Sequence, residues 1–220
     1  MNQPVAFGEH IRGYGIRVLN EREVRAAAGL LFVLMFTAIL DVVFRGDFLL
    51  LKYAILIFLT DILIRVFASP RFSPFLIVGR LIVRNQVPEY VGAQQKYFAW
   101  IIGTGLATVM FIHVVLLNAR GPIAGVLCFT CLIFLFFESA FGICLGCKFY
   151  SLLHKEQAQY CPGEACAAGS REAIQHTSKA QLIIVLGFIV YIATMVFALN
   201  DSFRREPHDL FVRGNSLQAP

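Results

Sequence analysis

The sequence places its chemistry-bearing side chains where one long apolar run ends, in the segment Glu138–Tyr150, E-S-A-F-G-I-C-L-G-C-K-F-Y. Cys144 and Cys147 form a C-x-x-C there, and two thiols at that spacing can form a disulfide or hold a soft metal such as zinc. Lys148 follows them, and its positive charge would favour the thiolate. We therefore predict that Cys144 and Cys147 are catalytic residues of redox or sulfur-transfer chemistry.

Glu138 is a third candidate catalytic residue, because it lies six residues before Cys144 and inside the apolar run. In a second apolar run, Asp61 and Arg65 are four residues apart, so they share a helix face and can pair. Ionisable groups at membrane depth usually face the bundle interior and need partners. We predict that Arg65 faces Glu138 or shares Asp61 with it. A structural ion pair, a proton-handling Glu138 and an Arg65 that reaches the headgroups all stay open.

The remaining cysteines offer weaker signals. Cys128 and Cys131 form another C-x-x-C, but their neighbours are all apolar, which favours packing. Cys161 and Cys166 are secondary thiols in a polar loop, where proline and glycine would allow a turn. His113 has no neighbouring ligand and is interpreted as an interfacial hydrogen-bonding residue. We expect no cofactor and no dedicated metal ligands, with zinc on the thiols as the alternative.

Composition predicts the class of protein. The chain has 220 residues, 58% of them hydrophobic and only 15% charged, with a mean hydropathy of +0.69. Soluble domains are about one-quarter charged, so we predict an all-α, polytopic helical membrane bundle. The net charge of +5 comes from bases at the ends of apolar runs, which suits anionic lipid headgroups and not nucleic acid. No P-loop, G-x-S-x-G or H-E-x-x-H motif supports a nucleotide-dependent or hydrolytic function.

The apolar runs predict five transmembrane helices, over about 24–43, 48–68, 98–117, 123–143 and 181–199. A shorter helix, Phe75–Val83, follows a double proline break and is predicted to lie in the membrane interface. Lys96 is predicted to lie at the headgroups. The chain then divides into an N-terminal arm (1–19), a core with four transmembrane helices (20–152), a Cys-containing polar loop (153–179), a fifth helix (180–200) and a polar tail (201–220).

Orientation follows from the Lys and Arg residues between these helices and at their ends, because such residues lie mainly on the cytosolic side of membranes. One side has twelve of them: Arg12, Arg17, Arg22, Arg25, Arg71, Arg80, Arg84, Lys96, Lys148, Lys155, Arg171 and Lys179. The other side has six: Arg45, Lys52, Arg120, Arg204, Arg205 and Arg213. We expect a multi-pass protein of the bacterial inner membrane, with its N-terminus and its Cys144–Cys166 region in the cytosol.

Four segments in order resemble one family. The fourth helix ends in the pattern E-x3-G-x-C-x-G-C-x2-Y, from Glu138 to Tyr150. This pattern resembles the bacterial membrane family known as domain of unknown function 4395. The resemblance covers about residues 18–152 and implies no activity. The other similar segments are Asn20-Glu21 with Arg25-Ala26 and Gly29; Asp61 and Arg65 with Ser69-Pro70 and Ser73-Pro74; and Gln95-Lys96-Tyr97-Phe98-Ala99-Trp100 with Gly103.

Four functions remain compatible with these residues. The first is a thiol protein that exchanges disulfide or sulfane sulfur with a thioredoxin-like or rhodanese-like partner. The second is a small transporter with a polar centre of Asp61, Arg65 and Glu138. The third is a soft-metal site shared by Cys144, Cys147, Cys161 and Cys166. The fourth is a structural or assembly subunit without chemistry. The bilayer is a partner in all four, and enzyme status, substrate and homo-oligomerisation stay open.

Overall fold

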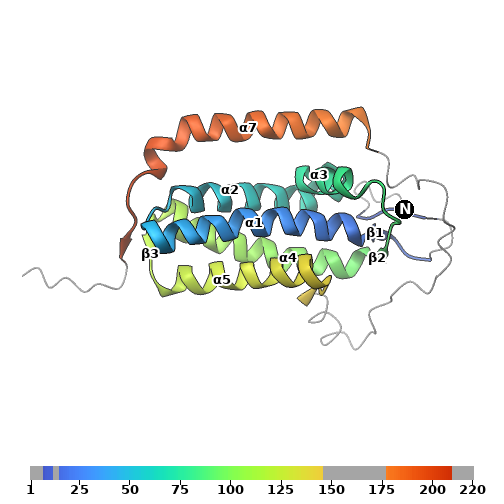
Figure 1. Cartoon of the computed structure of the whole chain (residues 1–220), viewed down its shortest axis with the longest axis horizontal. Helices are drawn as coiled ribbons and strands as arrows, with labels where there is room; N and C mark the ends of the chain where they lie inside the picture. Colours follow the sequence, from blue (N-terminus) through green and yellow to red (C-terminus); the bar gives the residue numbers. More distant parts are fainter. Residues whose placement is uncertain (1–6, 12–14, 146–176, 210–220) are drawn as a thin grey trace, which may run out of the picture.

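A computed structural model describes residues 7–11, 15–145 and 177–209, and it is a helical bundle (Figure 1). The all-α class predicted from the sequence is therefore confirmed. The α-helices are α1 (Glu21–Arg45), α2 (Leu49–Leu63), α3 (Pro74–Val83), α4 (Ala93–Met110), α5 (Pro122–Phe136) and α7 (Lys179–Phe203).

Short segments complete the fold. Helices α2, α4 and α5 continue into π-helical turns: η1 (Ile64–Ala68), η3 (Phe111–Leu116) and η4 (Phe137–Phe141). A 3₁₀ turn, η2 (Pro70–Phe72), precedes α3. Two-stranded ladders join β1 (Val18–Asn20) to β2 (Tyr90–Gly92), antiparallel, and β3 (Ala119–Arg120) to β4 (His208–Asp209), parallel.

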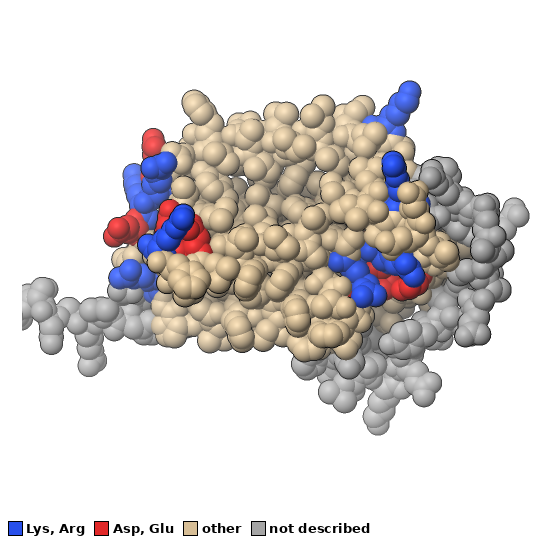
Figure 2. Space-filling view, viewed as in Figure 1, with Lys and Arg blue, Asp and Glu red and all other residues tan. Residues whose placement is uncertain are grey.

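Four helical segments among the described residues are long and apolar enough to cross a membrane: Glu21–Arg45, Ala93–Leu116, Pro122–Phe141 and Lys179–Phe203. These segments agree with four of the five predicted transmembrane helices. The helix predicted over about 98–117 begins earlier, at Ala93. Helices α2 and η1 fill the remaining predicted span, but they include Lys52, Asp61 and Arg65. Figure 2 shows that, on the face in view, Lys, Arg, Asp and Glu gather at the two ends of the bundle, with residues of other types between them.

Helix starts and ends follow from local chemistry. The side chain of Asn20 accepts a hydrogen bond from the Arg22 N–H at 3.2 Å, and α1 begins at the residue after Asn20. Helix α1 ends at Gly46, whose φ of 71° is a left-handed conformation that glycine adopts readily. Ser73 caps α3 by accepting from the Leu76 N–H at 3.2 Å, and Pro74 occupies the first helical position.

Helix α1 is central, with α2, α3 and α5 packed around it (Figure 1). Helix α3 forms where the sequence predicted it and buries one face against α1. A Cβ atom added at Gly79 would lie only 2.7 Å from the carbonyl oxygen of Glu23, so the two backbones approach closely. The other neighbour of α3 is α7, since the Phe75 ring lies 6.3 Å from the ring of Phe188.

The N-terminal arm is paired with the core where it is described. Val18 is fully buried, and Glu9 forms a β-bridge with it. Glu9 also accepts a hydrogen bond from Arg71 Nε at 3.1 Å. These contacts hold Glu9 at the end of the bundle where α1 and α4 begin.

Candidate functional site

The end of the bundle where α1 and α4 begin and where η1 and η4 end contains three buried ionic clusters. The sequence order explains why they meet there, because consecutive antiparallel helices return their alternate ends to the same side of the membrane. The second and third clusters join helices that are far apart in sequence. Ionisable groups this deeply buried require partners, and each cluster supplies them.

The first cluster is centred on Asp61, which is fully buried. Arg65 Nε donates to Asp61 Oδ2 at 2.7 Å, and the Arg65 side chain is only 5% exposed. The Ser73 hydroxyl donates to Asp61 Oδ1 at 2.7 Å, and the Phe75 N–H donates to the same oxygen at 3.1 Å. The Arg65 guanidinium also lies 5.2 Å above the Trp100 ring, in a cation–π contact. The predicted Asp61–Arg65 pair therefore forms, and Arg65 does not reach the headgroups.

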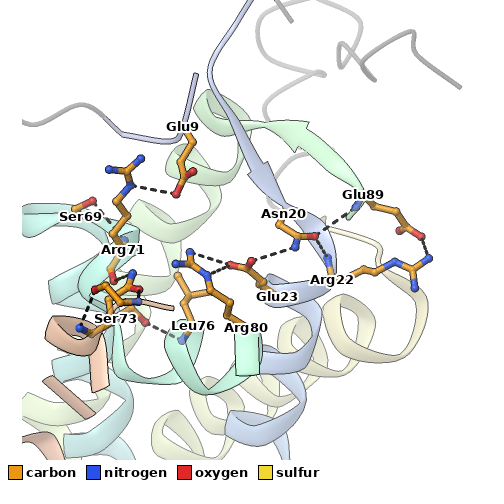
Figure 3. Close-up of polar contacts among 12 residues, drawn as sticks. Glu9, Asn20, Arg22, Glu23, Ser69, Arg71, Ser73, Leu76, Arg80 and Glu89 are labelled. Atoms are coloured by element: carbon orange, nitrogen blue, oxygen red, sulfur yellow. Dashed lines mark hydrogen bonds and ion pairs between the residues drawn. The ribbon is translucent and has the colours of Figure 1, made fainter. Parts of the chain in front are cut away.

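The second cluster joins α1 to α3 and is drawn in Figure 3. Glu23 accepts from Arg80 Nε at 3.1 Å and from the Asn20 side-chain amide at 3.0 Å. Both charged side chains are less than 10% exposed. Nearby, Arg22 and Glu89 form a much more exposed pair at 2.5 Å. The second cluster thus holds the short helix α3 to the start of α1.

The third cluster joins α1, α4 and η4 through Lys96, whose side chain is 1% exposed. Its ammonium group donates to Glu21 Oε1 at 3.0 Å and also forms a hydrogen-bonded ion pair with Glu138. The prediction that Lys96 lies at the headgroups is therefore wrong. The base that Glu138 contacts is Lys96, and the predicted pairing of Glu138 with Arg65 is replaced by this contact.

A cavity of about 80 Å³ lies between α1, α2, α4 and α5, beside the first and third clusters. Arg65, Glu138 and Trp100 contribute to its wall, together with Cys131 and Cys144. Apolar residues complete the lining: Val24, Ala28, Leu31, Phe58, Ile62, Ala99, Gly103, Leu106, Phe134, Leu135 and Leu145. The cavity therefore brings together both charged residues of the predicted Arg65–Glu138 pair and one cysteine from each of two C-x-x-C motifs.

The described cysteines differ in their surroundings. Cys128 and Cys131 are free thiols at 5% and 4% exposure, which agrees with their interpretation as packing residues. Cys144 is half-buried and lies three residues after the end of η4. The predicted site residues Cys147, Cys161 and Cys166 lie outside the described residues. Within the described residues no group of three His, Cys, Asp or Glu side chains could hold a metal ion.

Each π-helical turn contains one ionisable side chain of interest: Arg65 in η1, His113 in η3 and Glu138 in η4. Such turns widen a helix locally and are frequent at functional sites. Arg65 and Glu138 both line the cavity, whereas His113 is 9% exposed and does not line it. Among the described residues, no hydrogen-bond partner contacts His113 Nε2. The two turns that reach the cavity are thus the ones next to the ionic clusters.

Comparison with known proteins identifies the chain. A family model described as a domain of unknown function, DUF4395, matches residues 19–155, which is more than half of the chain. The chain belongs to this family. It matches no curated protein and no solved structure.

The DUF4395 match includes all three ionic clusters, the cavity, Cys144 and Cys147. Helix α7, Cys161 and Cys166 follow the matched residues. The site that the structure describes is therefore built entirely from the DUF4395 region. Its apolar helices also indicate a membrane protein.

Sequence reasoning found Asp61, Arg65, Glu138 and Cys144 but missed Glu21, Glu23 and Lys96. Neither glutamate was predicted as a site residue, and Lys96 was predicted to lie at the headgroups. One signal could have pointed to a missing partner, because every charge inside a membrane needs an opposite charge nearby. Glu138 has no Lys or Arg three or four residues away in its own segment, so its partner had to come from another helix.

Proposed function

We propose that this membrane protein exchanges disulfides with a thioredoxin-like partner through Cys144 and Cys147. The observation that carries the proposal is that Cys144 lines a cavity beside a buried glutamate–lysine–glutamate cluster. A half-buried cysteine next to ionisable groups has the surroundings of a reactive one, whereas an inert cysteine is buried among apolar side chains. Cys128 and Cys131 have the second kind of surroundings.

The reaction balances with the partner as the only oxidant. The Cys144 thiolate attacks one sulfur of the partner disulfide, that S–S bond breaks, and a mixed disulfide forms. Cys147 then attacks the mixed disulfide, which forms the Cys144–Cys147 disulfide and releases the partner as a dithiol. Two electrons and two protons pass from this protein to its partner. The reverse sequence would oxidise a reduced partner.

The cytosol is the side on which we propose that this exchange takes place. Of the eighteen Lys and Arg residues used to assign orientation, Arg80, Lys96 and Lys52 are buried in the bundle and say little about headgroups. Without them the ratio remains two to one in favour of a cytosolic N-terminus, in what we propose is the bacterial inner membrane. The reducing cytosol would keep a dithiol reduced at rest, so the chemistry would be reversible.

The experiment uses the full chain in lipid nanodiscs, equilibrated in glutathione buffers of graded redox ratio. Thiols are then alkylated and each cysteine peptide is quantified by mass spectrometry. We expect Cys144 and Cys147 to oxidise together as one two-electron couple, and Cys128 and Cys131 to stay reduced. The control variant, C128S with C131S, should show the same couple.

Cys144 and Cys147 remaining as two independent thiols at every ratio would refute disulfide exchange. A persulfide on Cys144 after incubation with a sulfane-sulfur donor, without the disulfide couple, would replace exchange by sulfur transfer. Bound zinc in the purified protein that is lost in C144S would replace it by metal binding.

Small-solute transport is a second candidate, and the cavity between four helices favours it. Arg65 and Glu138 provide polar groups in an otherwise largely apolar wall, which is the usual composition of a binding pocket. Flux across liposomes that depends on Arg65 and Glu138, and not on Cys144, would support transport over thiol exchange. Normal folding and full function of C144S with C147S would favour a structural role.

A further inference from the structure

We propose that Arg25 positions the segment that leads to Cys144, and that its positive charge stabilises the Cys144 thiolate when the protein is reduced. Arg25 lies on α1, 115 residues before Ala140, the residue of η4 that it contacts. The inference rests on the proposed disulfide exchange. It names a residue outside the C-x-x-C that sets how strongly the Cys144–Cys147 disulfide oxidises a partner.

Arg25 fastens the end of η4 to α1. Its guanidinium Nη2 donates to the Ala140 carbonyl oxygen at 3.3 Å, and Ala140 belongs to the last turn of η4. Basic side chains bond such carbonyl groups readily, because the last carbonyls of a helix have no partner inside it. Two residues later, a Cβ atom added at Gly142 would lie 3.3 Å from three atoms of the Arg25 side chain. Arg25 therefore contacts the backbone at two points shortly before Cys144.

The same geometry brings the Arg25 charge close to Cys144. Cys144 follows Gly142 by two residues, and two residues of backbone span at most about 7 Å. Arg25 and Cys144 are both half-buried, so solvent screens the interaction between them less than it would on an open surface. A thiolate is favoured next to arginine or lysine. The position of Arg25 thus suits stabilisation of negative charge on the Cys144 sulfur.

Two other bases of this region are compensated by carboxylates. Arg65 lines the same cavity as Cys144, but it is paired with Asp61 at 2.5 Å. Lys96 is shared by the two carboxylates of the third cluster, which therefore has no surplus positive charge. Among the described residues, no carboxylate forms an ion pair with Arg25, although one carboxylate of the third cluster, a turn earlier on α1, is near enough to interact with it. Of these three bases, Arg25 has the charge that is least compensated.

The Arg25 charge acts on the balance between disulfide and dithiol. Two glutathione molecules reduce the Cys144–Cys147 disulfide: its S–S bond breaks, glutathione disulfide forms, and two electrons pass to the two cysteines. Cys147 takes one of the two glutathione protons, the other goes to water, and the Cys144 sulfur keeps its negative charge. Arg25 stabilises this charged reduced form and not the uncharged disulfide. A disulfide whose reduced form is stabilised is a stronger oxidant.

The test measures the equilibrium between the Cys144–Cys147 couple and glutathione, at neutral pH, in the full chain in nanodiscs. R25Q removes the charge and keeps a hydrogen-bond donor for the Ala140 carbonyl, whereas R25K keeps the charge. We expect R25Q to shift the equilibrium constant about tenfold toward the disulfide, which corresponds to about 30 mV. R25K should stay close to the parent protein, because a purely charge-dependent effect survives this exchange.

R22Q is the matched control. Arg22 lies three residues earlier on the same helix and loses the same charge, but it is already paired with Glu89 at 2.5 Å (Figure 3). Its equilibrium constant should match that of the parent protein. A tenfold shift in R22Q as well would mean that any positive charge at this end of the bundle has the effect, and would overturn the role of Arg25.

Three further results would overturn the proposal. The first is an unchanged equilibrium constant in R25Q, and the second is a shift in R25K as large as that in R25Q. R25M takes the place of R25Q if R25Q does not fold. The third is that neither charge-free variant folds, which would assign Arg25 to folding alone. Absence of a Cys144–Cys147 couple in the parent protein would instead refute the proposed disulfide exchange itself.

Discussion

Lys52 Nζ lies 3.0 Å from the carbonyl oxygen of Phe203, the last residue of α7. The same ammonium group donates to the Arg205 carbonyl at 2.9 Å and to the Asn118 side chain at 2.6 Å. Lys52 is 1% exposed, although its sequence position suggested a charge outside the membrane. Carbonyl groups at a helix C-terminus carry partial negative charge, so this buried lysine fastens α7 to the DUF4395 region.

We predict that K52M loosens the C-terminal end of α7 while the rest of the bundle stays folded. The substitution keeps the apolar stem and removes all three hydrogen bonds. Hydrogen exchange by mass spectrometry should show faster exchange over the last turns of α7. R45M is the control, because the Arg45 side chain is 79% exposed and pairs with Asp41 of its own helix. Equal exchange in both variants would contradict this role of Lys52.

Asp61 is predicted to contribute more to stability than any exposed charge of the protein. D61A would leave Arg65 buried without its partner, and breaking a buried pair in this way costs about 3–5 kcal/mol. Its free energy of unfolding in detergent should fall by an amount in that range. E89A, which breaks the exposed pair with Arg22, should change it by at most about 1 kcal/mol. Similar losses in the two variants would show that Asp61 is not a structural centre.

Much of the fold could be predicted because lipid imposes a minimum length on apolar helices. The Asn20 cap, the Gly46 turn and the short helix before Arg84 also follow from local rules. Contacts between side chains of different helices do not follow from local rules, since they depend on how each helix is rotated about its own axis. Gly103 illustrates this: an added Cβ would lie 2.8 Å from Ile62, as expected for close helix packing, but Gly105 has no neighbour within 4 Å.

The same reason explains the errors at the site. Asp61 and Arg65 are four residues apart, so helical periodicity alone predicts their pairing. Glu21, Lys96 and Glu138 come from three separate segments, and no local pattern links them. Lys96 was predicted to lie at the headgroups, yet its side chain is buried and pairs with two carboxylates from other helical segments.

Gly79 provides a test of the contact between α1 and α3. G79A should destabilise the protein, because the new Cβ would lie 2.7 Å from the Glu23 carbonyl oxygen and 3.2 Å from the Ala27 nitrogen. Overpacking of this kind typically costs about 1–3 kcal/mol. G105A is the control, since nothing lies within 4 Å of its new atom and alanine favours the helix. A G79A protein as stable as G105A would show that α3 does not pack tightly on α1.

Gly142 connects the ionic end of the bundle to Cys144. It ends η4 with a φ of 65°, a left-handed conformation that costs residues other than glycine about 1–2 kcal/mol. A Cβ there would also lie 3.3 Å from three atoms of the Arg25 side chain. G142A should therefore move the backbone between η4 and Cys144.

We expect G142A to change the reactivity of Cys144 more than the stability of the bundle, because few buried contacts depend on this position. The measurement is the rate of Cys144 reaction with 4,4′-dithiodipyridine, with the free energy of unfolding determined in parallel. G187A is the control for adding a methyl group, since Gly187 has no neighbour within 4 Å. A G142A protein that keeps the parent rate while losing stability would mean that Gly142 serves folding and does not position the thiol.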